Sequence, residues 1–562
     1  HLSGRSGNTI KNCTISDFWD GIYLSSSANN NTITNNTVTS NVQNGIYLEN
    51  SSGNNLIGNV ANSNEQWSGI YLYSSSNNRL ENNTANSNGQ TGIRLYTSSN
   101  NNLINNVTNS NGGFGIYLLF SSNNNVLTNN TATLNRNGIT IYSSSNNTLT
   151  NNTANSNSNN GITIEYHSSN NYLENNFANS NGADGILINE FSSSTTLIKN
   201  TANSNNFSGI SISGTSTDNV LVSNITNSNH GNGIQLLNYS TNNILRWNIA
   251  KLNNINGLYI DSNSSNNNRI ETSRFCSNNQ SGGNYYDILD ESNNHFANNI
   301  CDTSNPQGKC AFSCDCARVI INPTSGLATT ESGGRANFSV SLNCPTMGEV
   351  RIDFSSSDQT EGQVSPTSLT FTTSTWNIPQ TVTITGIDDF VDDGNVTYFI
   401  LTGPTVSADE DYNNLDPENV EVTNIDNDEP VFGGDSIQSQ VSNLIRMGKL
   451  EYAKELMEKY PHLFPSRAET QKPISCPYFV KHLRFGVFDP EVKKVQQFLK
   501  DQGFFPKDQE TTNYFGPITL SAVKKFQAKF SKEILQPWGI TQPTGYWFIT
   551  TKKQANKLVG CE

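Results

Sequence analysis

The stretch SGIYLYSSSNNRLENNTANSNGQ at residues 68–90 contains the unit that decides the fold of this chain. Its glycine, followed by aliphatic residues at the first and third positions, recurs at a spacing of 23 or 24 residues. The eleven glycines are Gly21, Gly45, Gly69, Gly92, Gly115, Gly138, Gly161, Gly185, Gly209, Gly233 and Gly257. A fixed period in this range is typical of stacked units that bury a core only together.

Short apolar alternation inside each unit predicts strands rather than helices. In Gly69-Ile70-Tyr71-Leu72 the period of two places Ile70 and Leu72 on one side and Tyr71 on the other. The Asn, Ser and Gly residues between the apolar positions favour turns. We therefore predict a parallel β-helix of about eleven coils, each with three short strands, with an aliphatic core and asparagine ladders at the corners. Coils stacked at about 4.8 Å would form a rod on the order of 50 Å long.

The balance of acidic and basic residues differs between the segments that follow the repeat. The protein has 562 residues and a formal net charge of −14, yet residues 319–430 contain 18 acidic and 2 basic residues, whereas residues 476–562 contain 13 basic and 7 acidic residues. We predict a β-helix with a Cys-rich C-terminal cap at 1–318, a β-sandwich at 319–430, a helical linker at 431–475 and a three-helix domain at 476–562. The acidic total argues against a nucleic-acid partner, and no apolar run reaches membrane-spanning length.

The nine cysteines and the first residues point to an exported protein. Cysteines that lie in pairs at domain ends are typical of oxidising compartments. They lie just past the last clear coil, at both ends of the C-terminal segment, and singly elsewhere: Cys276, Cys301, Cys310, Cys314 and Cys316; Cys476 and Cys561; Cys13 and Cys344. The chain begins inside a coil, because residues 6–14 already match the Asn-rich block, so we expect an upstream export signal outside this sequence.

Two interpretations of the central cysteine group remain open. A disulfide-stapled cap is favoured, and a metal site at Cys310, Cys314 and Cys316 is the alternative. We also expect a disulfide between Cys476 and Cys561. Because the total is odd, at least one thiol stays free, and Cys13 and Cys344 are the candidates.

Residues 319–430 alternate in the manner of strands at 336–342, 368–372 and 380–385, with turn residues at sandwich spacing. Carboxylates gather at the expected strand ends, where they would repel one another unless a hard cation joined them, and Ca²⁺ suits such a set. The candidate ligands are Glu331, Asp388, Asp389, Asp392, Asp393, Asp426 and Asp428. The alternative is a solvated acidic surface. The segment, with TSGLATTESGG and NIDNDEP, resembles the Calx-β-like repeats of bacterial surface proteins, which implies a β-sandwich spacer that is often stiffened by calcium.

A helical pattern starts at Asp435, and the C-terminal segment then contains two distinctive motifs. They are Val-x-x-Val-Gln-x-x-Leu at residues 492–499 and YFGPITLSAVKKFQ at residues 514–527. Both resemble the bacterial peptidoglycan-binding domain of the three-helix type, although Asp489-Pro490 and Gly545-Tyr546-Trp547-Phe548 depart from the family pattern. The resemblance implies binding of the cell wall. Its candidate contacts are Tyr514, Phe515, Gly516, Pro517 and Thr519.

The β-helix repeats resemble the right-handed β-helix repeats shared by NosD-like periplasmic proteins, polysaccharide lyases and epimerases. An enzyme of that class needs two or three carboxylates, or an acid and a base, in one site. Only Glu165, His167 and Glu190, on consecutive coils, come close enough to matter, and a polar outer surface predicts such a coincidence without catalysis. We therefore assign no catalytic residue and keep these three as the candidates of an alternative hypothesis.

Outward-facing tyrosines are the more promising feature of the repeat. Aromatic rings among Asn and Ser suit sugar binding, whereas the alternative is that Tyr is simply a good strand former at exposed positions. One row follows the glycine by two residues and a second row by four: Tyr23, Tyr47, Tyr71 and Tyr117; Tyr73, Tyr96 and Tyr142.

The leading hypothesis from the sequence is an exported, cell-wall-associated surface protein without catalytic activity. It would bind peptidoglycan through its C-terminal domain and present a β-helix that binds glycans or surfaces. The alternative is a carbohydrate-active β-helix enzyme, a polysaccharide lyase, hydrolase or epimerase, that is targeted to the cell wall.

Overall fold

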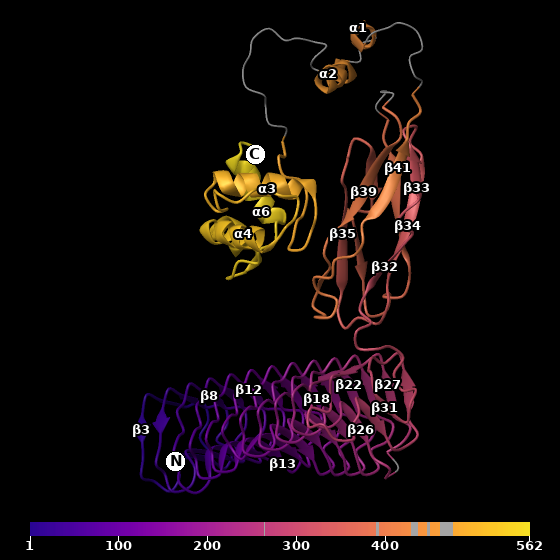
Figure 1. Ribbon diagram of the computed structural model, residues 1–562. Coiled ribbons are helices and arrows are strands. Elements are labelled where there is room, and N and C mark those ends of the chain that lie inside the picture. The colour runs from indigo at the N-terminus through magenta and orange to yellow at the C-terminus, as the bar shows by residue number, and fades with distance from the viewer. Residues whose placement is uncertain (264, 389–392, 429–436, 447–449, 461–475, 562) are drawn as a thin grey trace. The chain divides into compact units, whose positions relative to one another are not determined.

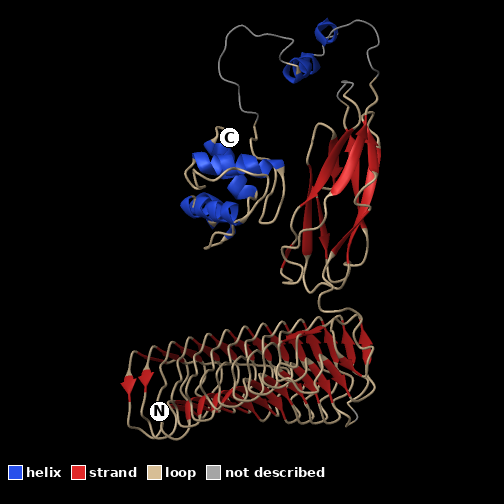
Figure 2. Cartoon of the chain, viewed as in Figure 1, coloured by secondary structure: helices blue, strands red, loops and turns tan. Residues whose placement is uncertain are grey.

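The computed structural model describes residues 1–562 except 264, 389–392, 429–436, 447–449, 461–475 and 562. Two units follow each other along the chain, His1–Gly433 and Gly434–Glu562. The first contains a parallel β-helix and a set of mostly antiparallel strands, and the second contains the described helices (Figures 1 and 2). The predicted domain boundaries at 318, 430 and 475 stay predictions.

Strands of successive coils pair in parallel and form two long sheets of 14 and 13 strands. The larger sheet comprises β1 (Leu2–Ser3), β4 (Ile22–Ser25), β7 (Ile46–Glu49), β9 (Ser68–Tyr73), β11 (Thr91–Tyr96), β13 (Phe114–Leu119), β15 (Asn137–Tyr142), β17 (Ile162–Glu165), β19 (Ile186–Ile188), β21 (Ile210–Ile212), β23 (Ile234–Leu236), β26 (Leu258–Ile260), β29 (Ile288–Asp290) and β31 (Ser304–Asn305). The smaller comprises β2 (Thr9–Lys11), β5 (Thr32–Thr34), β8 (Asn55–Ile57), β10 (Arg79–Glu81), β12 (Asn102–Ile104), β14 (Val126–Thr128), β16 (Thr148–Thr150), β18 (Tyr172–Glu174), β20 (Thr196–Ile198), β22 (Val220–Val222), β24 (Ile244–Arg246), β27 (Arg269–Glu271) and β30 (His295–Ala297).

The third side of the coils is held by shorter pairings. At its two ends β3 (Thr14–Ile15) pairs with β6 (Thr37–Val38), and β25 (Ile249–Lys251) pairs with β28 (Arg274–Cys276). Single parallel bridges connect the coils between them. Three strand positions per coil, as predicted, therefore enclose the core.

The aliphatic positions of the repeat form that core. Ile46, Leu48 and Leu56 of one coil are fully buried, and their equivalents stack above and below them in register. The larger sheet also extends beyond the eleven glycine coils, with β1 before them and with β29 and β31 after them. The sequence count of eleven missed the coils after Gly257 because their motif differs: Asp287 lies beside Gly257, where a glycine would continue the series.

The repeat glycine is required by the close approach of neighbouring coils. A Cβ atom built on Gly138 would lie 2.5 Å from the carbonyl oxygen of Gly161 in the next coil and 2.8 Å from the Cβ of Ala154. Real Cβ atoms do not tolerate such distances from backbone atoms, because protein interiors are already close-packed. The glycine at this position of each coil is thus required sterically.

Asparagine ladders run along the corners of the coils, as predicted. In one of them Asn106 donates from its backbone N–H and from its Nδ2 to Oδ1 of Asn130, both at 2.9 Å. Asn130 donates in the same way to Asn152 in the following coil. All three side chains are fully buried. Each coil therefore supplies a hydrogen-bond acceptor to the turn of the preceding coil, and these bonds offset the cost of burying the amides.

The strands between 319 and 428 form two sheets, as the sequence predicted. One has four strands: β32 (Val319–Asn322), β34 (Arg335–Leu342), β38 (Gln380–Gly386) and β36 (Gly362–Ser365). The other has six: β33 (Leu327–Thr330), β41 (Val420–Ile425), β39 (Val396–Thr402), β35 (Val350–Ser356), β37 (Ser368–Phe371) and β40 (Val406–Ser407). Apolar residues of both sheets share one core, in which Phe338 and Phe354 meet edge to face.

Four disulfides staple the chain, and three of them lie at the C-terminal end of the β-helix and the start of the sandwich. The pairs are Cys276–Cys314, Cys301–Cys310, Cys316–Cys344 and Cys476–Cys561. The disulfide cap and the Cys476–Cys561 bond are confirmed, and the alternative of a metal site at Cys310, Cys314 and Cys316 is wrong because all three sulfurs are bonded. The free thiol is Cys13. Cys344, the other candidate, is paired.

The second unit contains the described helices. Two lie in the predicted linker, α1 (Ile437–Arg446) and α2 (Leu450–Lys459). The C-terminal domain has α3 (Pro490–Asp501), α4 (Pro517–Lys529), the short α5 (Ser531–Ile534), the 3-10 turn η2 (Gln536–Trp538) and α6 (Ile549–Leu558). Trp547 is fully buried and packs against Phe479, Phe498 and Phe526. No helix in the described ranges is long and apolar enough to cross a membrane.

Candidate functional sites

The first tyrosine row lies on the outer face of the larger sheet, one residue per coil. Tyr23, Tyr47 and Tyr71 are in register, and their ring centroids are 5.0 Å and 5.1 Å apart in nearly parallel planes. Arg94 takes the equivalent place in the next coil, followed by Tyr117. The row therefore consists of three stacked rings, one arginine and one further ring.

The second row is longer than the sequence predicted. Tyr73 stacks on Tyr96 at 5.2 Å, and Tyr142 stacks on Tyr166 at 4.9 Å. Phe120, which the glycine-based count missed, lies between these pairs in edge or tilted contact with Tyr96 and Tyr142. The coil around Phe120 places this ring one residue later than the repeat position, so spacing from the glycine could not find it.

Stacking changes what the tyrosines offer to a ligand. Rings such as Tyr47 cover one another's faces, so they expose mainly edges and hydroxyl groups along the row. Tyr71 is only 7% exposed, and burial raises its pKa to about 12. Tyr23 donates a hydrogen bond to Glu49, and burial together with this carboxylate raises the Tyr23 pKa to about 12. The hydroxyls therefore stay protonated, so a ligand would meet them as neutral hydrogen-bond donors and acceptors.

Glu165, His167 and Glu190 lie on neighbouring coils, but no hydrogen bond joins their side chains within the described residues. Burial, and secondarily the charge of Glu190, raises the pKa of Glu165. The ring of His167 stacks on Phe191 at 5.1 Å, and its backbone N–H donates to the carbonyl of Glu190. The three residues therefore lack the hydrogen-bonded acid–base geometry of a catalytic site.

The candidate peptidoglycan contacts divide into surface and core residues. Tyr514 is 42% exposed, Gly516 caps α4 and Pro517 begins it. Phe515 and Thr519 are buried, so their assignment as direct contacts needs correction. Phe515 packs in the domain core, and Thr519 accepts a hydrogen bond from Nε2 of Gln496 of α3 at 2.8 Å.

Phe488 adds an exposed ring to this surface. It is 75% exposed, forms a backbone bridge with Tyr514, and its ring centroid lies 6.4 Å from that of Tyr514. The candidate contacts from the sequence did not include Phe488, which stands directly before the departure from the family pattern at Asp489-Pro490. Phe488 and Tyr514 are the exposed pair, which we call the Phe488–Tyr514 surface.

Three carboxylates of the sandwich converge as the calcium hypothesis requires. Glu331, Asp426 and Asp428 each offer an oxygen atom within 4.8 Å of the other two. Asn427 donates from Nδ2 to Glu331 and to Asp388, at 3.4 Å and 3.3 Å. Asp393 is described but does not belong to the group of three, and Asp389 and Asp392 lie outside the described residues. The donor set, all oxygen, fits a hard cation such as Ca²⁺.

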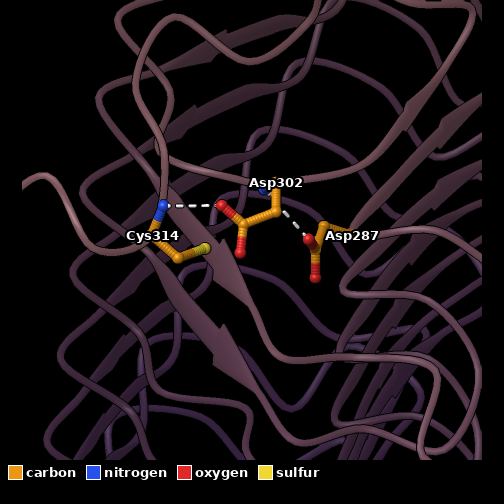
Figure 3. Close-up of side chains that lie close together, drawn as sticks. All are labelled: Asp287, Asp302 and Cys314. Carbon is orange, nitrogen blue, oxygen red and sulfur yellow. Dashed lines mark hydrogen bonds between the residues drawn. The ribbon is translucent and has the colours of Figure 1, made fainter.

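A second acidic group, at the end of the β-helix, has a structural explanation. Asp287, Asp302 and Cys314 lie close together (Figure 3). The sulfur of Cys314 is in a disulfide and is therefore no thiolate ligand. Asp287 Oδ2 accepts from the backbone N–H of Asp302 at 3.1 Å, and its Oδ1 accepts from Asn278. These hydrogen bonds connect the last coils, and the carboxylate of Asp287 takes the place of a ladder asparagine.

The architecture defines a β-helix repeat protein that also contains a sandwich and a small helical domain. Residues 1–153 and 69–225 match the family model described as right handed beta helix region, and residues 488–532 match the putative peptidoglycan binding domain. The chain thus combines a right-handed β-helix region with a peptidoglycan-binding domain. The two corresponding resemblances inferred from the sequence are confirmed, and the Calx-β-like resemblance of the sandwich segment stays a prediction. No curated protein matches this chain.

Alginate epimerases are among the solved structures similar to this chain. The A-module of mannuronan C-5 epimerase AlgE4 of Azotobacter vinelandii is 14% identical, with 56% of this chain and 83% of that chain covered and a TM-score of 0.34. The periplasmic alginate epimerase AlgG is 14% identical, with 52% and 76% covered and a TM-score of 0.32. Likenesses at this level carry no argument about activity.

Proposed function

We propose that this protein is an exported, cell-wall-associated surface protein that binds peptidoglycan through its C-terminal domain. In this proposal the β-helix is not catalytic and presents a glycan- or surface-binding face. The observation that carries the proposal is the peptidoglycan-binding domain match at 488–532, in one chain with a long β-helix. Four disulfides support an oxidising location outside the cytoplasm.

Wall binding is assigned to the Phe488–Tyr514 surface. Two exposed rings beside the start of α4 offer apolar faces, which sugar rings and peptide stems can contact. Lysines give the domain a basic surplus, which favours anionic wall polymers in addition. Phe515 and Thr519 would hold this surface in place from the core.

The test is co-sedimentation of the full chain with purified cell walls. Wild-type protein should be retained, Tyr514→Ala should lower retention at least about tenfold as expected for a central aromatic contact, and Tyr546→Ala should not. Tyr546 is a matched control because it is 38% exposed, close to the 42% of Tyr514. Failure of the wild-type chain to sediment at low salt would remove the proposal. Equal losses of retention in both variants would show that wall binding is not specific to the Phe488–Tyr514 surface.

For the sandwich we propose a calcium site at Glu331, Asp426 and Asp428, with a role in stiffening this part of the chain. A cation would relieve the repulsion among the three carboxylates, and one that binds only the folded state stabilises it by about 2.7 kcal/mol at a hundredfold excess over Kd. Millimolar calcium should raise the melting temperature of this part relative to EDTA. Asp426→Asn should abolish the rise, and Glu421→Gln, an exposed acid on β41, should preserve it.

The alternative function, a carbohydrate-active enzyme, rests on the raised pKa of Glu165. Burial that raises the pKa of a carboxyl is one way in which enzymes prepare a general acid. Screening polysaccharides for cleavage or epimerisation tests it directly. Turnover that disappears in Glu165→Gln would replace the binding proposal for the β-helix, whereas turnover unchanged in that variant would place the chemistry elsewhere.

A further inference from the structure

Arg94 interrupts the first tyrosine row and is surrounded by aromatic side chains. Its Cζ lies 5.1 Å from the centroid of the Tyr71 ring and 5.5 Å from that of Trp67. In the next coil Phe114 and Tyr117 stack on each other at 4.1 Å, with Tyr117 in register with Arg94. We call these five residues the Arg94 cluster. Its rings shield the guanidinium from water on the side of the preceding coil.

The guanidinium of Arg94 has no carboxylate partner among the residues that the structure describes. Four other arginines of the β-helix do form ion pairs: Arg79 with Glu81, Arg246 and Arg269 with Glu271, and Arg274 with Asp409. The Nε atom of Arg94 is buried and lacks a hydrogen-bond partner within the described ranges. A partly desolvated cation with unused donors is costly unless an anion joins it.

A carboxylate is the anion whose geometry fits. Guanidinium donors form a planar fork that binds two carboxylate oxygens at once, and the half-buried rings of Trp67 and Tyr117 beside it offer their exposed edges to the apolar face of a sugar. The neighbouring hydroxyls of Tyr71 and Tyr117 stay neutral, because burial raises the pKa of each to about 12. Because these hydroxyls carry no negative charge, the cluster suits the carboxylate of an acidic sugar rather than a free cation.

Acidic side chains on either side limit how many carboxylates a ligand can carry. Glu49 lies two coils before Arg94, and Glu165 lies three coils after it, about 10 Å and 14 Å at the spacing of parallel strands. Glu49 and Glu165 are in register with the tyrosines of the second row, which runs parallel to the first row. A polymer charged at every sugar would place carboxylates near these acids, whereas a polymer with isolated carboxylates would avoid them.

We propose that the Arg94 cluster is a subsite for a carboxylate on an otherwise neutral glycan. This inference rests on the proposed glycan-binding role of the β-helix and names its ligand class. Arg94 binds the carboxylate, Trp67 and Tyr71 position the guanidinium, and Glu49 and Glu165 disfavour polyuronates.

The test is titration calorimetry of the full chain with three oligosaccharides at about 0.01 M ionic strength, where the Debye length is about 30 Å. The probes are a neutral chitohexaose, an oligomer of alternating N-acetylglucosamine and glucuronate, and an oligomer of uronate alone. The alternating oligomer should bind tightest. Arg94→Gln should weaken it about 10- to 100-fold, as expected for a hydrogen-bonded ion pair, and leave chitohexaose unchanged.

Control variants separate this inference from the proposed function. Arg79→Gln removes an ion-paired arginine of the other long sheet and should leave all affinities unchanged, and Arg94→Lys should restore part of the affinity through charge alone. If no probe binds the wild-type chain, the glycan-binding role of the β-helix fails and the inference with it. If the alternating oligomer binds but Arg94→Gln is indistinguishable from wild type, or if the uronate oligomer binds tightest, only the inference is overturned.

Discussion

Asn130→Ala probes how much one rung of an asparagine ladder contributes to the β-helix. The side chain accepts two hydrogen bonds from Asn106, through its backbone N–H and its Nδ2, and donates to the carbonyl of Leu103 and to Asn152. Alanine would leave both Asn106 donors without this acceptor, although Asn106 Nδ2 keeps its bond to the carbonyl of Leu80. Asn152 still accepts from the backbone of residue 130. The lost hydrogen bonds to Asn106 and Leu103 therefore affect the preceding coil.

The expected cost follows from the two buried donors of Asn106. Only the backbone N–H of Asn106 is left unsatisfied, because Nδ2 keeps its bond to Leu80, and one unsatisfied buried group costs about 1–3 kcal/mol, so Asn130→Ala should lower the free energy of unfolding of the β-helix by about 1–3 kcal/mol. Asn130→Ser should have an intermediate effect. Ser273 occupies the equivalent position further along this ladder, and its Oγ accepts from the N–H of Asn248 at 3.1 Å. Asn55→Ala is the control, because Asn55 is exposed on β8.

Denaturant unfolding followed by far-UV circular dichroism measures the free energy, and hydrogen exchange of the peptide around Asn106 locates the effect. Exchange should accelerate at the Asn106 amide before it does in distant coils, because contacts in a solenoid are confined to neighbouring coils. The reasoning would be refuted if Asn130→Ala cost no more than Asn55→Ala, or if protection at Asn106 were unchanged.

Three further predictions concern packing, charge and covalent structure. Gly138→Ala should destabilise the β-helix by about 1–3 kcal/mol or more in thermal unfolding, since its Cβ would meet a carbonyl of the next coil at 2.5 Å. Burial raises the pKa of Asp184 to about 6, so stability should fall as pH rises from 4 to 6, and Asp184→Asn should add up to about 3 kcal/mol at pH 7 and nothing at pH 3 in urea titrations. Replacing both Cys476 and Cys561 by Ser should cost the C-terminal domain about 2–5 kcal/mol, because the bond closes a loop with a sequence separation of 85, and calorimetry of its transition would show this.

The repeat predicted its own fold because the alternation in each copy specifies which residues are buried and the period specifies which residues stack. Ile46, Leu48 and the ladder asparagines all lie where this pattern places them. Coils without the glycine escaped the count, since Asp287 stands in register with Gly257 and its carboxylate accepts the hydrogen bonds of the ladder residue Asn278.

Side-chain direction in the C-terminal domain was harder to derive. The motif around Tyr514 is local, but whether a residue faces solvent depends on how the helices pack. Phe515 and Thr519 are therefore buried although they flank exposed positions. Disulfide partners such as Cys316 and Cys344 also depend on three-dimensional proximity, which their sequence separation of 28 does not reveal.

Arg94 did leave a signal in the sequence. It stands two residues after Gly92, where three preceding coils have tyrosine, and reading this column of the repeat would have exposed the substitution. Its missing carboxylate partner, in contrast, becomes visible only when the neighbouring coils are placed beside it.

The asparagine ladders make the coils interchangeable, and this has an evolutionary consequence. Each rung donates to the next coil in the same way, so a gene could lengthen or shorten the rod by duplicating or losing whole units. Removal of Gly138 through Asn160, one complete coil, would join Asn137 to Gly161 and restore every ladder with a rod about 4.8 Å shorter. A deletion of a single residue would instead move the asparagines of that coil out of register with those of the neighbouring coils. Selection can therefore change the reach of this protein in discrete steps, while the coils that contain the Arg94 cluster stay untouched.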